Sequence, residues 1–171
     1  ATAAVVIAES SNLQADVNTA QILVSALPDG SVRTALQVRI NAVQAIIDLA
    51  TEVAAFRSTH ATALGLTVDT VVIGNRVIVV AGIHDYENHL SAGAMSALGA
   101  EHTLLDSLLA KIVILENEAA AVAAINAATS GTMGVTITTN ADTLGLVLTD
   151  YTALTDKSTV HTALVGQAFA D

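Results

Sequence analysis

The stretch LQVRINAVQAIIDLATEVAAF, residues 36–56, decides most of the fold that the sequence predicts. Its apolar residues recur at alternating spacings of four and three, which places them on one side of an α-helix. They are Leu36, Ile40, Val43, Ile47, Ala50 and Ala54, and a second row beside them holds Ile46, Leu49, Val53 and Phe56. We therefore predict a long helix over about residues 33–62, which contacts more than one neighbour because its apolar stripe is wide.

A second long helix is predicted over about residues 101–128, where the same alternation of three and four recurs. In a parallel coiled coil, Lys111 would occupy a g position and Glu116 the following e position of the partner, so the two fit an interchain ion pair. The alternative is two solvated charges. The predicted oligomer interface consists of Leu105, Leu108, Lys111, Ile112, Leu115, Glu116, Ala119 and Val122.

The segment between the two helices predicts β-structure. Residues 68–80, VDTVVIGNRVIVV, are β-branched almost throughout, and Gly74-Asn75 is a plausible two-residue turn. We expect a Val-rich β-hairpin near residues 69–80, a further strand at Val135–Thr139, and a helix over residues 150–170. The predicted fold class is therefore mainly α with a small β component (α+β), with two long helices flanking the hairpin.

The predicted organisation is a helix–hairpin–helix body over residues 1–128, followed by a smaller strand-plus-helix segment over 129–171. That segment is either separate or part of the same domain. The chain reaches Asp171 without a helix-ending signal, which leaves a continuation open.

Composition excludes several classes of function. Hydrophobic residues make up 53% of the chain and aromatic residues only 2%, so the core is built from small aliphatic side chains. The net charge is -10 and the six basic residues are scattered, so we expect no nucleic-acid partner. No apolar run reaches about 18–20 residues, so we expect no membrane span. The absence of cysteine excludes disulfides and thiolate metal sites.

One polar cluster interrupts this apolar chain: His84, Asp85, Glu87 and His89. The histidines are five residues apart, which suits neither a helix face nor a strand face, although Asp85 and His89 can share a helix face. Glu101 and His102 would approach it from the next helix. We expect a polar loop in which Asp85 or Asn88 caps a helix, with both histidines dispensable for folding and no stoichiometric metal. The alternative is a helical-bundle metal-binding protein that uses the His84–His102 region.

The remaining sequence signals do not indicate an enzyme. His60 is interpreted as a cation near a helix C-terminus, and His161 as a packed or interface histidine. Nucleophile, Walker A and dinucleotide-binding motifs are absent, so we expect neither catalysis nor a cofactor.

The Ala/Thr/Asp-rich character of Thr152–Leu164, TALTDKSTVHTAL, resembles that of bacteriophage virion accessory proteins, such as head-decoration proteins and fibre-anchoring segments. The resemblance is one of composition rather than motif, and it assigns no functional residue. It implies a structural protein that attaches to a capsid or tail protein as an oligomer, often a trimer, and is located in the virion. The alternative is a subunit of a bacterial surface or extracellular filament. Self-association as a trimer is the favoured expectation.

Overall fold

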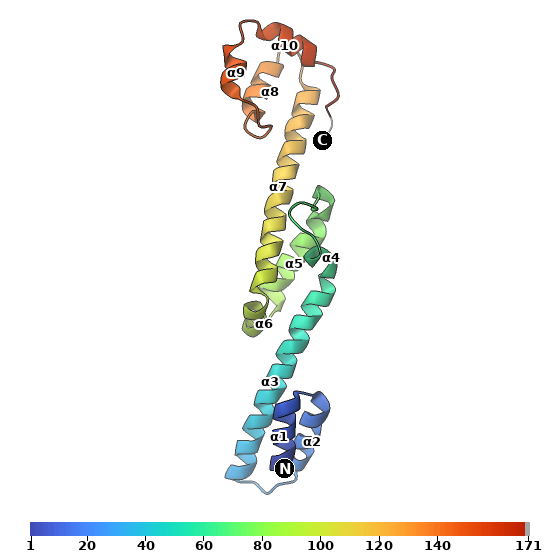
Figure 1. Ribbon diagram of the computed structural model, residues 1–171, viewed down its shortest axis with the longest axis vertical. Coiled ribbons are helices and arrows are strands. Elements are labelled where there is room, and N and C mark those ends of the chain that lie inside the picture. Colours follow the sequence, from blue (N-terminus) through green and yellow to red (C-terminus); the bar gives the residue numbers. More distant parts are fainter. Residues whose placement is uncertain (170–171) are drawn as a thin grey trace. The chain divides into compact units, whose positions relative to one another are not determined.

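The computed structural model describes residues 1–169, and every regular element in that range is a helix (Figure 1). The predicted α+β class is therefore wrong, and the fold is all-α. The two long helices are confirmed: α3 covers Ser31–Thr59 and α7 covers Gly99–Ala127. The other elements of this range are α1 (Thr2–Ser11), α2 (Gln14–Ser25), α4 (Ala61–Leu64), the 3-10 helix η1 (Ile73–Asn75), α5 (Arg76–His89), α6 (Ala92–Ala97), α8 (Met133–Asn140), α9 (Leu148–Ala153) and α10 (Lys157–Leu164).

The chain divides into two units. Unit 1 comprises residues Ala1–Gly65 and Val80–Leu105, and unit 2 comprises Leu66–Val79 and Asp106–Asp171. Both α5 and α7 begin in one unit and continue into the other. These boundaries do not coincide with the predicted division after residue 128, and a separate C-terminal segment stays a prediction.

The N-terminal part of unit 1 is a bundle of α1, α2 and α3. Asn12 ends α1 in the left-handed conformation at φ 51, and its N–H donates to the Ala8 carbonyl oxygen at 2.9 Å. This turn allows α2 to begin at Gln14. The β-prone run Val5–Ile7 lies inside α1 because packing of Val5 in the core outweighs local propensity. The core consists of Val5, Ala8, Val17, Ala20, Val24, Leu36, Ile40 and Val43.

Residues 68–80 form no hairpin. The Val72 N–H donates to Asn75 Oδ1 at 2.9 Å, and the Asn75 N–H donates to the Val72 carbonyl oxygen at 2.9 Å. This closed turn leads into α5 instead of reversing a strand. Along α5, Val79 is fully buried while Val77 is 77% exposed. A helix accounts for this pattern, because residues two apart on a strand face the same side of the sheet.

The predicted strand at Val135–Thr139 is also wrong, because these residues belong to α8. Met133, Ile137 and Ala141 are buried at a spacing of four, while Val135 is 72% exposed. A strand would place Met133, Val135 and Ile137 on the same side, so the exposure of Val135 between two buried residues fits a helix. The expected helix over 150–170 is instead two short helices, α9 and α10, separated by extended backbone at Leu154. Its last predicted residue, Ala170, lies outside the described residues.

Candidate functional site

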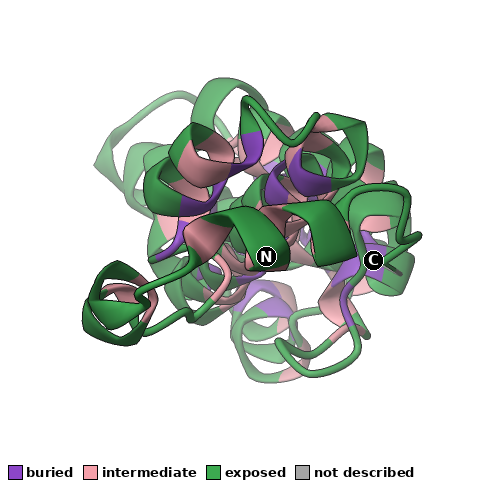
Figure 2. Ribbon diagram, turned by 90° about the horizontal axis from the view of Figure 1, so that it is seen from above, coloured by how far each residue is buried: buried purple, intermediate pink, exposed green. Residues whose placement is uncertain are grey.

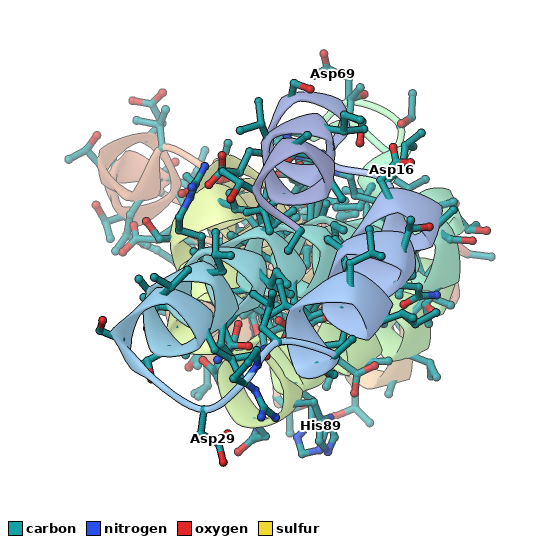
Figure 3. The ribbon with its side chains drawn as sticks, turned by 90° about the horizontal axis from the view of Figure 1, so that it is seen from below. Asp16, Asp29, Asp69 and His89 are labelled. Carbon is teal, nitrogen blue, oxygen red and sulfur yellow. The ribbon has the colours of Figure 1, made fainter. Side chains whose placement is uncertain are left out.

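Unit 1 contains a hydrogen-bonded row of two histidines and one carboxylate. His60 follows the last turn of α3, and its Nε2 lies 2.9 Å from Asp85 Oδ2 on α5. The other carboxylate oxygen, Asp85 Oδ1, lies 3.0 Å from His89 Nδ1. His60 is buried, whereas the side chain of His89 is 63% exposed and points away from the ribbon in Figure 3. Asp85 thus connects the interior of unit 1 to its surface.

The electrostatics of this row keep Asp85 ionised. The pKa of the Asp85 carboxyl is lowered, first by the hydrogen bond from His89 and further by the hydrogen bond from His60. Desolvation acts in the opposite direction but does not outweigh them. The carboxylate is therefore available as an anionic ligand or hydrogen-bond acceptor.

His84 joins the row from the preceding residue of α5. Its ring centroid lies 5.3 Å from that of His89, with the two rings nearly perpendicular. One ligand atom each from His84, Asp85 and His89 lies within 4.8 Å of the other two.

The expectation of a polar loop with Asp85 or Asn88 as a cap is wrong, because His84, Asp85, Asn88 and His89 all lie within α5. The Asn88 side chain donates to the His84 carbonyl oxygen at 2.9 Å.

A surface pocket of about 340 Å³ lies beside this row. The Phe56 ring lies 4.7 Å from the His60 ring and lines the pocket together with His60, Asp85 and His89. The ring packing holds His60 in place, which in turn fixes the orientation of Asp85. The other lining residues are Glu52, Ala55, Thr59 and Leu90.

Glu101 and His102 take part in other interactions of unit 1. Glu101 forms an ion pair with Arg57 at 2.6 Å. His102 stacks on Tyr86 with ring centroids 4.0 Å apart, and the Tyr86 hydroxyl donates to the Met95 carbonyl oxygen. His102 thus approaches the polar cluster from α7 as expected, because its Nε2 also lies 3.9 Å from Glu87 Oε1, whereas Glu101 is engaged with Arg57.

His161 belongs to a separate polar contact in unit 2. Its Nε2 lies 2.7 Å from the Tyr151 hydroxyl, close to Gly134 of α8. A Cβ at position 134 would lie 2.9 Å from His161 Cε1, so any larger residue there would require the His161 ring to shift. The interpretation of His161 as a packed histidine is confirmed.

The residues predicted to form an oligomer interface divide into two groups. Leu105, Leu108 and Ile112 are fully buried within the single chain, so their side chains already have intrachain neighbours. Leu115, Ala119 and Val122 remain partly exposed. Glu116 pairs with Arg76 of the same chain, and Lys111 is partly exposed.

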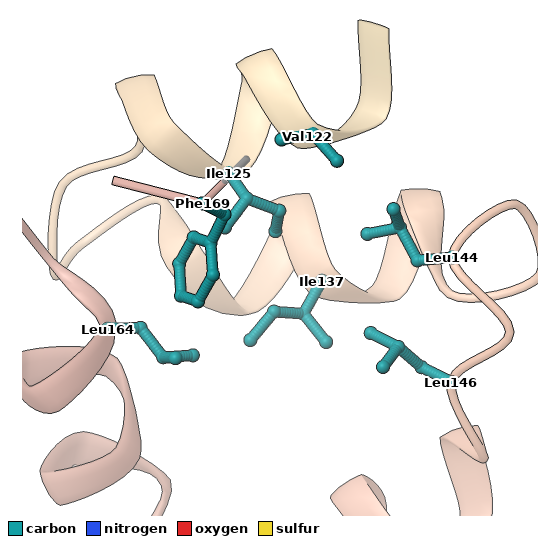
Figure 4. Close-up of a pocket in the computed structure, with 7 residues that line it drawn as sticks. All are labelled: Val122, Ile125, Ile137, Leu144, Leu146, Leu164 and Phe169. Carbon is teal, nitrogen blue, oxygen red and sulfur yellow. The ribbon is translucent and has the colours of Figure 1, made fainter. Parts of the chain in front are cut away.

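Unit 2 also contains a pocket of about 360 Å³ with an almost wholly apolar lining (Figure 4). Ile125 of α7 and Ile137 of α8 belong to the local core and contribute to its wall. No charged side chain lines it, so it offers hydrophobic contact without a group that would orient a polar ligand. The lining residues are Val122, Ile125, Ile137, Leu144, Leu146, Leu164 and Phe169.

The outer sides of α1, α2 and α3 form a feature that the sequence indicated only through the width of the apolar stripe on α3. In Figure 2, buried residues (purple) alternate along the helices with intermediate (pink) and exposed (green) ones. On α3, the side opposite the core carries five exposed apolar residues, which we call the outer face of α3. They are Ala35, Val38, Ala42, Ala45 and Ile46. Exposed Val6, Ile7 and Ile22 extend the same character to α1 and α2.

No helix within residues 1–169 is both long enough and apolar enough to cross a membrane. No protein-family model, curated protein or solved structure matches the chain.

Proposed function

We propose that this chain is a non-enzymatic structural protein that acts by self-association, most simply as a trimer in a bacteriophage virion. The observation that carries the proposal is the outer face of α3. Val38 is 62% exposed and Ile46 is 53% exposed, on a helix that already buries Leu36, Ile40 and Val43 on its other side. A helix that is apolar on two sides is typical of one covered on both.

The charge pattern of the bundle supports association through this face. The charged side chains of α3 nearest to it are engaged elsewhere, because Arg39 forms an ion pair with Glu9 at 2.6 Å. Arg33 likewise pairs with Asp29, just before the helix. Covering the outer face would therefore bury few charges. Full burial of one Val or Ile side chain contributes about 1.5–3 kcal/mol.

The rim of the bundle contains amides suited to a polar border. Gln21 and Gln37 exchange hydrogen bonds between α2 and α3 at 2.7 and 2.8 Å, and Gln14 and Gln44 do so at 2.8 Å. These pairs link the two helices through uncharged groups, and Gln44 also donates to the exposed Asp48 carboxylate at 2.8 Å. An interface with an apolar centre and a polar rim is the usual arrangement between protein subunits.

The virion assignment rests on the compositional resemblance of Thr152–Leu164 to phage accessory proteins, and attachment to a capsid or tail protein is part of the proposal. A subunit of a bacterial surface or extracellular filament is the alternative. The two differ in symmetry, because a closed trimer has a fixed mass whereas a head-to-tail contact that does not close produces filaments.

A charge placed on the outer face tests the proposal. We expect the double variant Val38→Asp/Ile46→Asp to lose self-association while remaining helical, because both side chains are exposed in the single chain. The matched control is Asn41→Asp, which adds a charge to α3 but keeps the oxygen that accepts from Gln37. The proposal is supported if the double variant dissociates and the Asn41→Asp control does not. Unchanged mass of the double variant, measured by sedimentation equilibrium, would contradict it.

A further inference from the structure

We propose that His84, Asp85 and His89 form a binding site for one divalent first-row transition-metal ion, of the class represented by Zn²⁺ and Co²⁺. The site uses two imidazole nitrogens and one carboxylate oxygen from a single helix, α5. This inference is independent of self-association, since all three ligands belong to one chain.

The five-residue spacing of His84 and His89 argued against a shared metal site, but the structure brings their rings close together. Residues five apart point about 140° apart around an ideal helix, so His84 and His89 are not direct neighbours on one face. Their ring centroids nevertheless lie 5.3 Å apart, with the rings nearly perpendicular. His89 Nδ1 contacts Asp85 Oδ1 at 3.0 Å, and His84 Nδ1 lies 3.2 Å from Asn88 Nδ2. The expectation of no stoichiometric metal rested on that spacing and on the lack of a second carboxylate–histidine set from another helix; the proposed site differs from that expectation in using α5 alone.

The three ligand atoms need to move only a short distance to bind one metal ion. Ligand atoms around a tetrahedral metal with bonds of about 2.1 Å are separated by about 3.4 Å. The three atoms here lie within 4.8 Å of one another, and the side chains of His84 and His89 are exposed and able to rotate. On metal binding, the hydrogen bond between His89 and Asp85 is exchanged for two metal–ligand bonds.

The ligand set indicates the kind of ion. Imidazole favours zinc, copper, nickel and iron over calcium and magnesium, which prefer oxygen ligands alone. Three protein ligands leave at least one coordination position open to water or another donor. The exposed position of His89 places that opening on the solvent side.

His60 supplies the outer support for the site. It contacts Asp85 Oδ2, the oxygen that does not contact His89, and it is itself 7% exposed and packed against Phe56. A histidine or carboxylate behind a ligand fixes its orientation, and losing such a group lowers metal affinity about 10–100-fold. His60 is thus a positioning residue rather than a ligand.

The test is titration of the untagged full chain with Co²⁺, followed by visible absorption, and with Zn²⁺, followed by calorimetry. We expect one ion per chain. His84→Gln and His89→Gln should each weaken binding by more than about tenfold, and His60→Gln by about 10–100-fold. The control is His161→Gln, which removes an imidazole from unit 2 and should leave the affinity unchanged. Circular dichroism of each variant checks that the helices persist.

Several outcomes would overturn the proposal. They are the absence of saturable binding by the wild-type chain, equal weakening by the control variant, or retention of full affinity by either ligand variant. If a glutamine variant does not fold, the alanine variant at the same exposed position replaces it, so the requirement for each ligand is still measured.

Discussion

Asp85 Oδ2 lies 2.9 Å from His60 Nε2, although the two residues are 25 positions apart in the chain. The contact connects the end of α3 to the middle of α5 within unit 1. It also gives Asp85 two histidine partners of very different exposure, which allows their contributions to stability to be separated by experiment.

Replacing the buried partner should destabilise the protein, while replacing the exposed one should not. We expect His60→Ala to lower the free energy of unfolding by about 1–3 kcal/mol, because it removes a hydrogen bond to a carboxylate and leaves space beside Phe56. His89→Ala should change it by no more than about 0.5 kcal/mol in metal-free buffer. Urea denaturation measures both, and equal effects of the two variants would show that burial of His60 does not stabilise unit 1.

A second prediction concerns the glycine at the centre of unit 2. Gly134→Ala should destabilise the protein by about 1–3 kcal/mol, because the new methyl group would lie 2.9 Å from His161 Cε1 and 3.1 Å from the Tyr151 hydroxyl. Gly99→Ala is the control, since nothing lies within 4 Å of a Cβ there. Alanine is also the better helix former, so that variant should be unchanged or slightly more stable.

The destabilisation caused by Gly134→Ala should be smaller when the His161 ring has been removed. In a His161→Ala background, the added methyl group meets only the Tyr151 hydroxyl, so the cost of Gly134→Ala should fall. Thermal unfolding of the wild-type protein, the two single variants and the double variant measures the coupling. Simple additivity would show that α8 does not approach His161 as described.

The third prediction concerns acid. Asp156 caps α10, and hydrogen bonds from Thr159 and Ser158 lower its pKa from 3.8 to about 2. Because the folded-state pKa is the lower one, the stabilisation is fully present above pH 3.8 and is lost as the pH falls toward 2. The amide resonance of Thr159 should report this loss.

Asp156→Asn is the matched control for that titration. Asparagine caps helices about as well as aspartate and does not titrate, so α10 should persist at low pH in this variant. A Thr159 resonance that shifts in the same way in both proteins would contradict a role for the Asp156 carboxylate.

The sequence predicts the long helices well because each carries many apolar residues at one spacing. Leu36, Ile40 and Val43 are all buried as the heptad requires, and α7 ends within one residue of its predicted end. The predictions of β-strands are wrong because a β-branched composition indicates strands only weakly, and tertiary packing can override it. In α5 and α8, single side chains such as Val79 and Ile137 face the core at helical spacing.

The candidate site was predictable only in part. The spacing of four between Asp85 and His89 correctly indicated a shared helix face, and their side chains do meet. His60 gave no signal, since nothing in its local sequence relates it to α5. The outer face of α3 was partly visible in the wide apolar stripe, but the sequence did not show which side would be left exposed.

Sedimentation equilibrium of the wild-type chain at micromolar concentration tests the central claim most directly. We predict a discrete species with three times the mass of the single chain, formed without any partner protein. A folded monomer across this concentration range would contradict self-association, and an open-ended distribution of masses would contradict the closed trimer in favour of a filament.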